Sequence, residues 1–394
     1  MRVTLLDGDA VLTYGSLSTY LNNLIKGLLT IDEGISLSIV TFRSSCKDKV
    51  IDYFRSKGVN VDVWSILNIK DLYNALRVSD IIHIPSGFSG IVRYPLILKI
   101  FKPILLVIHG VSPIYAPNFY SGREELRWRF GFLLSRLRFQ ISRAIPSDGW
   151  AIVVPSKRAK MHVINNILSN SNSNIHIVYH GIEISQELLR IADARLFNRL
   201  FGDRLQPYNF FIHIGFHHPK KNILSILLAY RKLLTRLKST SKPKLVLIGS
   251  SDRPFVRNFL FPLMQRLGLS KSCVMMHRIT ELEKLCLYKF ALGLTFPSLD
   301  ETFGYPVAEA LSCGTPTLTS HEVAVAEEVL NDYVIFVKDP KNPEEIYLKM
   351  KYVLENHEEI RRRLEAVRLV IKDRLSIKVM AHKYAKIYQQ LADH

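Results

Sequence analysis

Short apolar runs alternate with stretches of helical periodicity along the whole chain. The first half contains "RVTLL", "ILLVIHG" and "IHIVYHG", and the second half contains "NFFIHIG", "KLVLIG" and "ALGLTF". Their β-rich composition predicts strands, and strands separated by helices form right-handed crossovers in parallel sheets. The pattern therefore predicts an α/β protein with parallel sheets.

The same pattern starts a second time near residue 207. Apolar residues recur at helical spacing after the first run (Leu17, Leu21, Leu24, Ile25 and Leu28) and again after "NFFIHIG" (Ile223, Ile226, Leu227, Tyr230, Leu233 and Leu234). We predict two Rossmann-like domains, 1–200 and 205–375, that face each other across a ligand cleft at the carboxyl ends of their strands. The polar stretch 184–206 would connect them, and we expect the C-terminal helix (376–394) to cross back to the first domain.

The composition narrows the class of protein further. A chain of 394 residues with 48% hydrophobic residues can fill two cores. Its net charge of +18 predicts an anionic partner, which leaves nucleic acid, acidic lipid and phosphorylated ligands. The four cysteines are scattered, and neither a signal peptide nor a membrane-spanning stretch is visible. We expect a cytoplasmic protein that is soluble or peripheral to a membrane.

The stretch "DETFGYPVAEALSCGTP" (300–316) predicts a loop, a short helix and a stop. Pro306 suits the first helical position, and a later glycine and proline suit the helix end. Glu301 would lie at the loop tip and Glu309 one turn into the helix. A helix N-terminus attracts phosphate and carboxylates accept hydrogen bonds from hydroxyls, so the stretch indicates a nucleotide sugar. Alternatively, each carboxylate only stabilises the helix N-terminus by ~0.3–1 kcal/mol.

Five ordered motifs together resemble the signature of a known family. The segment "FPSLDETFGYPVAEALSCGTPTLTS" carries two glutamates separated by seven residues, a Phe-Gly turn and a Gly-x-Pro sequence. It resembles the retaining GT-B glycosyltransferases, specifically glycosyltransferase family 4. Four further stretches agree with that family in order and spacing: "TYGSLSTYLNNLIKGL", "LLVIHG", "VVPSKRAK" with "IHIVYHGIE", and "IHIGFHHPKKNILSILLAY".

This resemblance implies an enzyme, a retaining hexosyltransferase that moves a sugar from a nucleoside-diphosphate sugar to an acceptor. The acceptor would be lipid-linked, a glycan or another molecule, and neither a cofactor nor a metal ion is expected. The implied catalytic residues are His109 beside the donor sugar, Lys221 at the diphosphate and Glu301 near the reacting carbon. Stabilising the charge of the leaving diphosphate is the main catalytic need.

The resemblance also implies a donor-binding set: Gly15, Gly215, Phe303, Gly304, Tyr305 and Glu309. Gly15 would let a bare backbone approach the donor, and Glu309 would bind the two vicinal ribose hydroxyls. The N–H groups of 303–305 would face the donor phosphates. Ser156 and Gly181 match family positions too, but we interpret them as structural turns. The "DGD" at 7–9 mimics a metal-binding Asp-x-Asp, and we interpret it as a loop.

One position departs from the family pattern. Where the family has Gly-Arg at the start of the second domain, this chain has Gly215-Phe216, and that arginine normally shares the diphosphate with the lysine. Two alternatives within enzymes stay open, a GT-B sugar-nucleotide epimerase and a transferase that modifies nucleic acid. Phe216 and the net charge favour a third, a catalytically weakened GT-B protein that binds nucleic acid or membrane.

The stretch 123–143 concentrates positive charge, with six arginines against two glutamates. Helical spacing gives it an aliphatic stripe and, nearly opposite, an aromatic stripe of Trp128, Phe132 and Phe139 that arginines flank. Basic residues beside aromatic side chains suit an anionic membrane surface, and they also suit stacking on nucleobases. We expect the membrane surface before nucleic acid, because transferases of this type commonly glycosylate lipid-linked acceptors.

Overall fold

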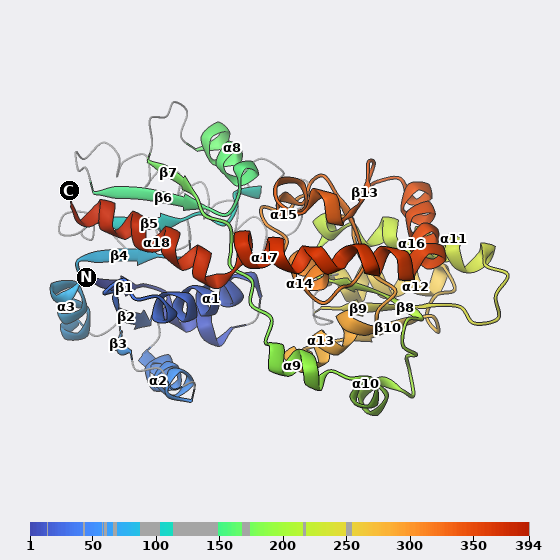
Figure 1. Cartoon of the computed structure of the whole chain (residues 1–394), viewed down its shortest axis with the longest axis horizontal. Helices are drawn as coiled ribbons and strands as arrows, with labels where there is room; N and C mark the ends of the chain where they lie inside the picture. The colour runs from blue at the N-terminus through green and yellow to red at the C-terminus, as the bar shows by residue number, and fades with distance from the viewer. Residues whose placement is uncertain are drawn as a thin grey trace. The chain divides into compact units, whose positions relative to one another are not determined.

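The chain forms two compact units, one made of Met1–Gly181 and Leu375–His394 and the other of Ile182–Arg374 (Figure 1). Each unit contains a parallel sheet with helices between its strands, so the predicted α/β fold with two Rossmann-like domains is confirmed. The computed structural model describes residues 1–13, 15–41, 44–56, 58, 61–65, 69–86, 103–112, 149–167, 174–215, 218–249 and 254–393.

In the described part of the first unit, seven strands follow the order β3-β2-β1-β4-β5-β6-β7. The strands are β1 (Arg2–Leu5), β2 (Ser36–Thr41), β3 (Asp62–Ser65), β4 (Ile81–Ile84), β5 (Ile104–Val107), β6 (Trp150–Val154) and β7 (Ile175–Ile177). The helices are η1 (Gly8–Leu12), α1 (Ser16–Thr30), η2 (Ser44–Cys46), α2 (Lys47–Arg55), α3 (Ile69–Val78), α8 (Lys157–Asn166) and α18 (Ile377–Ala392). Every residue of β4 and β5 is buried, as in a central parallel strand that is covered on both faces.

The sheet of the second unit follows the order β10-β9-β8-β11-β12-β13. Its strands are β8 (Phe210–Ile214), β9 (Lys244–Ile248), β10 (Cys273–Met276), β11 (Gly293–Phe296), β12 (Thr317–Ser320) and β13 (Ile335–Val337). Its α-helices are α9 (Gln186–Ile191), α10 (Ala194–Phe201), α11 (Ile223–Arg236), α12 (Phe261–Arg266), α13 (Glu281–Phe290), α14 (Tyr305–Ser312), α15 (Ala324–Glu328), α16 (Pro343–Arg363) and α17 (Val367–Leu375). The short 3-10 and π turns are η4 (Pro219–Lys221), η5 (Val256–Leu260), η6 (Asn331–Tyr333) and η7 (Leu364–Ala366).

The first unit breaks at Gly181, earlier in the chain than the predicted boundary at 200, and the stretch 184–206 is not a connection. Helices α9 and α10 fall in this stretch and pack against α13, so they belong to the second unit. The ring of Phe197 stacks on Phe210, with 5.8 Å between centroids, and also contacts Phe290. A few buried aromatic and aliphatic side chains therefore hold a mostly polar segment in the second core.

In both sheets, the strand that comes first in the chain lies in the interior of the sheet. In the first unit β1 lies between β2 and β4, and in the second unit β8 lies between β9 and β11. The connections that leave β1 and β4, or β8 and β11, diverge from neighbouring strand ends, which creates a topological switch point at the carboxyl edge of each sheet. Ligands of doubly wound proteins bind at such points, so the topology marks one candidate site in each unit.

The helix α18 completes the first unit and packs against α1, as Figure 1 shows. Gly27 allows the close approach, because an added Cβ at this position would lie 2.6 Å from the carbonyl oxygen of Ile377. Gly181 has the same role, since its Cβ would lie 2.7 Å from the Cα of Ile377. Both glycines therefore serve packing against the start of α18.

A buried chain of hydrogen bonds ties α18 to the sheet. Tyr20 donates to Tyr384 at 2.7 Å, so the Nε2–H of His83 must donate to the Tyr20 oxygen, which lies 3.3 Å away. Nδ1 of His83 then accepts from the hydroxyl of Tyr388 at 2.5 Å. This arrangement requires a neutral imidazole, and burial lowers the pKa of His83 to about 3.

We expect acid to destabilise the first unit from about pH 6.5 downwards. His83 is neutral in the folded state but takes up a proton in the unfolded chain below its ordinary pKa of about 6.5. Stability is therefore lost as the pH falls, by up to about 1.4 kcal/mol per pH unit for this histidine. Urea unfolding followed by tryptophan fluorescence reports on this unit, since all three tryptophans belong to it.

The variant His83→Gln should be less stable at pH 7 but should lose less stability between pH 6.5 and pH 5 than the wild type. The matched control is His382→Gln on α18, because the His382 side chain is 56% exposed. Equal acid sensitivity of the wild type and His83→Gln would show that His83 is not the buried neutral group described above.

Candidate functional site

The switch point of the second unit brings together two segments that are distant in the sequence. The chain leaves β8 through Gly215 and the 3-10 turn η4, and it leaves β11 through the segment that ends at Glu301. Because β8 and β11 are paired neighbours, these segments meet at the same sheet edge. The backbone N–H of Leu299 donates to the carbonyl of Lys220 at 2.8 Å and fixes the two segments to each other.

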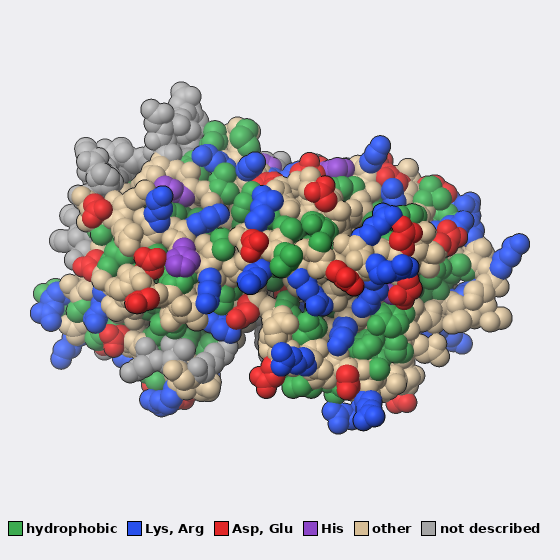
Figure 2. Space-filling view, viewed as in Figure 1, with side chains coloured by type: hydrophobic (Ala, Val, Ile, Leu, Met, Phe, Trp, Pro, Cys, Tyr) green, Lys and Arg blue, Asp and Glu red, His purple; other side chains and the backbone are tan. Residues whose placement is uncertain are grey.

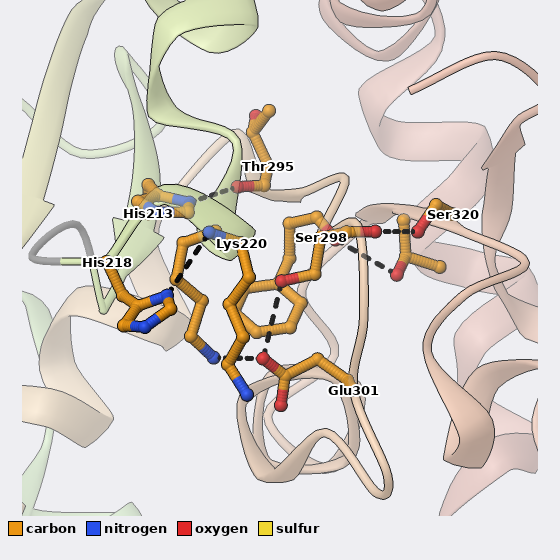
Figure 3. A network of polar contacts seen from close by, with 10 residues as sticks. His213, His218, Lys220, Thr295, Ser298, Glu301 and Ser320 are labelled. Atoms are coloured by element: carbon orange, nitrogen blue, oxygen red, sulfur yellow. Dashed lines mark hydrogen bonds and ion pairs between the residues drawn. The ribbon is translucent and has the colours of Figure 1, made fainter. Parts of the chain in front are cut away.

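Lys221 and Glu301 form an ion pair at this edge. Figure 3 shows the Glu301 carboxylate together with Ser298. The ammonium group of Lys221 donates to Oε1 of Glu301, and the hydroxyl of Ser298 lies 3.4 Å from the same oxygen. The Lys221 ammonium also lies 4.7 Å from the centroid of the Phe296 ring. The two charged side chains are only 16% and 13% exposed, so the pair is largely removed from water.

Burial opposes the charged form of both side chains. Burial raises the pKa of the Glu301 carboxyl, but the positive charge of Lys221 outweighs this effect and lowers the pKa below its ordinary value. Burial lowers the pKa of Lys221, although Glu301 opposes that effect. Glu301 is thus an anion at neutral pH, and a further negative group beside Lys221 would stabilise the lysine cation.

Gly215 leaves room for the lysine. Its φ of +90° is a conformation that side-chain-bearing residues rarely adopt, and an added Cβ would lie 3.1 Å from Cε of Lys221. His218 caps the start of η4, because its Nδ1 accepts from the N–H of Lys220 at 3.2 Å (Figure 3). The absence of a side chain at Gly215 therefore leaves space for the Lys221 side chain.

The loop between Glu301 and α14 is anchored on both sides. The N–H of Glu301 donates to Glu322, and the carbonyl of Phe303 accepts from Val325 at 2.9 Å. Phe303 is buried and its ring contacts that of Tyr305 at a centroid distance of 5.0 Å. Helix α14 starts at Tyr305, one residue before the predicted N1 proline, and ends at Ser312 as the sequence indicated.

Gly304 opens α14 in a left-handed conformation, with φ at +105°. An added Cβ would lie 2.4 Å from Cγ1 of Val323, so both the backbone and the space require glycine. Helix α14 therefore begins at Tyr305, directly after this glycine. Residues 303–305 lie in the loop and first turn that were predicted to face phosphates.

Glu309 lies apart from this ion pair, in contact with α13. Its Oε1 accepts from the Lys284 ammonium at 2.9 Å and its Oε2 accepts from the Tyr288 hydroxyl at 3.1 Å. The sequence analysis did not identify Lys284 or Tyr288. The sequence does contain a capping box at Thr280 and Glu283. This motif marks the start of α13, but it does not show that Lys284 and Tyr288 contact Glu309.

Gly15 follows β1 and η1 at the switch point of the first unit, and His109 follows β5, the neighbour of β4 in the sheet. Nε2 of His109 donates to the carbonyl of Pro85 at 2.7 Å, so Nδ1 accepts from Nε2 of His180 at 3.2 Å. Burial lowers the pKa of His109 to about 4, which keeps the imidazole neutral. Gly15 precedes α1 with φ at +120° and is exposed.

The structure therefore brings Lys221 and Glu301 into contact, with Gly215 beside the lysine. Gly304 connects this pair to α14, whereas Glu309 is held from α13. Ser156 caps α8 by accepting from the N–H of Ala159 at 2.9 Å, which agrees with its interpretation as a structural residue. Phe216 and the stretch 123–143 lie outside the described residues.

The "DGD" segment is built into the first unit. Asp7 is buried and accepts a hydrogen bond from the Ser86 hydroxyl, and the residues after it form η1. Among the described residues, no group of three or more histidine, cysteine, aspartate or glutamate side chains is arranged to hold a metal ion.

The charge is spread over the visible face rather than concentrated. Figure 2 shows lysine and arginine side chains over both units, with acidic side chains between them. None of the described helices combines the length and the apolar composition that crossing a bilayer requires.

Known proteins agree with this architecture. Residues 202–368 match the family described as glycosyl transferases group 1. The O-antigen chain mannosyltransferase RfbU of Salmonella typhimurium is 22% identical over 232 residues, 59% of this chain and 56% of RfbU. The uncharacterized glycosyltransferase MJ1178 of Methanocaldococcus jannaschii is 22% identical over 96% of this chain and 95% of that protein. Anabaena Alr3699/HepE in complex with UDP-glucose has a TM-score of 0.71 at 13% identity, over 99% of this chain and 100% of HepE.

Similarity to solved structures at this low identity shows the fold, and that fold is GT-B, the two-domain architecture of many glycosyltransferases. The predicted GT-B fold is thereby confirmed, and residues 202–368 are similar to the glycosyl transferases group 1.

We expect Gly304→Ala to destabilise the second unit more than Gly314→Ala. Both glycines have a positive φ, but an added Cβ at Gly314 has no atom within 4 Å, whereas at Gly304 it would clash with Val323. Positive φ alone costs about 1–3 kcal/mol for a residue other than glycine, and the clash adds to this cost at Gly304. Urea unfolding followed by circular dichroism measures the difference, and equal losses would contradict the close approach to Val323.

Proposed function

We propose that this protein transfers a hexose from a nucleoside-diphosphate sugar to an acceptor, with retention of the anomeric configuration and without a metal ion. The Lys221–Glu301 ion pair at the switch point of the second unit is the observation that carries the proposal. It places a cation and an anion side by side at the sheet edge where ligands of this fold bind.

The two charges suit the two ends of the bond that breaks. Departure of a nucleoside diphosphate from the anomeric carbon builds negative charge on a phosphate oxygen and positive charge on the sugar. Lys221 would neutralise the phosphate, and Glu301 would hold sugar hydroxyls and stabilise the positive charge. Because both side chains are largely buried, each charge acts at a low effective dielectric and is worth more than in water.

The buried lysine also takes over a metal ion's task at the diphosphate. Its ammonium group is preorganised by Glu301 and by the Phe296 ring, so little reorganisation is required when a phosphate arrives. The first turn of α14 adds N–H groups next to Glu301. We therefore propose a donor site without a resident cofactor, in which the nucleotide sugar is the substrate.

The relatives support the choice of sugar class and acceptor class. The name of RfbU assigns it mannosyl transfer in the O-antigen chain, and HepE was solved with UDP-glucose. By similarity we propose a hexose donor and a glycan or lipid-linked acceptor for this chain. A cytoplasmic location, peripheral at a membrane, would suit such an acceptor.

We expect Lys221→Ala to lower kcat on the order of a hundredfold, because one charge would be lost from the leaving group. The control is Lys220→Ala, which should have a much smaller effect. The test measures release of nucleoside diphosphate from a panel of nucleotide sugars in EDTA, with acceptor and without, and assigns the product anomer by NMR. Binding of nucleotide sugars without transfer or hydrolysis would contradict an enzyme and favour a binding protein. An inverted product would contradict retention.

We further propose that the stretch 123–143 attaches the protein to anionic membranes through Trp128, Phe132 and Phe139. Each arginine near an anionic surface contributes about 1 kcal/mol, so six are sufficient for peripheral attachment. The wild type should sediment with anionic vesicles at low salt, and Trp128→Ser/Phe132→Ser should sediment less. Equal sedimentation of both proteins, or competition by single-stranded nucleic acid, would contradict the membrane contact.

A further inference from the structure

Glu309 is held by two side chains on one face of α13. Lys284 and Tyr288 are four residues apart in this helix, so they point in the same direction. Each supplies one donor to a different carboxylate oxygen, at 2.9 Å for Lys284 and 3.1 Å for Tyr288. The Glu309 side chain is only 11% exposed, and Lys284 also pairs with Glu281 at 2.9 Å.

We infer that Lys284 and Tyr288 are positioning residues that orient the Glu309 carboxylate for two vicinal hydroxyls of the donor nucleotide. The inference rests on the proposed function and deepens it. A carboxylate offers about four lone-pair sites, and α13 occupies one on each oxygen. One site on each oxygen is left, which matches the paired 2′- and 3′-hydroxyls of a ribose.

Lys284 and Tyr288 are both hydrogen-bond donors to Glu309. Burial alone would lower the pKa of Lys284, but the negative charges of Glu309 and Glu281 outweigh it and raise the pKa. Burial raises the pKa of Tyr288 well above its ordinary value, and Glu309 adds to this effect, so the phenol keeps its proton. Both partners therefore remain hydrogen-bond donors to the Glu309 carboxylate over the whole physiological range.

Removal of the lysine takes away one of the two contacts that hold the carboxylate. Without Lys284, the Glu309 carboxylate would lose the ion pair at Oε1, and Tyr288 would still donate to Oε2. A carboxylate held at one oxygen can turn about that contact, so its acceptor sites no longer keep the geometry that two vicinal hydroxyls require. Ribose recognition would then weaken.

The test compares two ligands that differ only in the hydroxyls. UDP, GDP and ADP are each titrated beside their 2′,3′-dideoxy analogues, and the nucleotide that binds the wild-type protein is used for the variants. The wild type should prefer the ribose form roughly tenfold to a hundredfold. Lys284→Met should reduce this ratio to near one at pH 7 while the affinity for the dideoxy form stays unchanged.

Three further variants control the test. Lys284→Arg keeps a cation and should restore part of the preference. Glu281→Gln removes the other ion-pair partner of Lys284. Because the Glu281 side chain is 48% exposed, this change should leave the ratio within a factor of two or so. Tyr288→Phe removes one hydroxyl and keeps the ring, so it should lower the ratio several-fold even where Lys284→Met does not fold.

The outcomes separate this inference from the proposed function. If the wild type binds none of the nucleotides, the proposed function fails. If the wild type prefers the ribose form and Lys284→Met and Tyr288→Phe keep that preference, the inference fails while the function stands. Equal losses of affinity for both ligands would show that the two residues only support the packing of α13 on α14.

Discussion

Parallel pairing that starts inside each sheet is the constraint on which the rest of the molecule depends. With β8 between β9 and β11, the two connections that diverge at its carboxyl end carry Lys221 and Glu301, which are eighty residues apart in the sequence. Neither side chain would be stable as an isolated charge at this depth. The strand order brings them together, and each charge then makes the burial of the other tolerable.

Short-range backbone chemistry made the central motif predictable from the sequence. Pro306 and Gly314 act within a turn of their own position, so the loop, the helix α14 and its end followed the sequence closely. The contact between Lys221 and Glu301 was also within reach, because a family resemblance assigned both residues to one ligand. The geometry of Gly304 against Val323 was not, since Val323 reaches this position only through the pairing of residues 301–303 with 322–325.

Tertiary contacts decided the points that the sequence left out or gave wrongly. The segment 184–206 is polar by composition, but Phe197 packs against two aromatic residues of the second core. These contacts, and not the average polarity of the segment, decide where it lies. Lys284 and Tyr288 read as ordinary positions of an amphipathic helix until α14 places Glu309 against them. The placement of His109 beside the donor sugar stays a prediction, and the fold adds contacts of its two ring nitrogens with Pro85 and His180. Composition and periodicity do not encode such pairings between distant elements.

The placement of α18 has a consequence for the order in which the protein forms. Tyr384 and Tyr388 are fully buried partners of the first sheet, yet the ribosome synthesises them after the entire second unit. Domains generally fold as units during synthesis, with those nearer the N-terminus first. Here the second unit is complete while Tyr20 and His83 still lack their partners. The first unit therefore completes its packing only after α18, the last helix, has been synthesised.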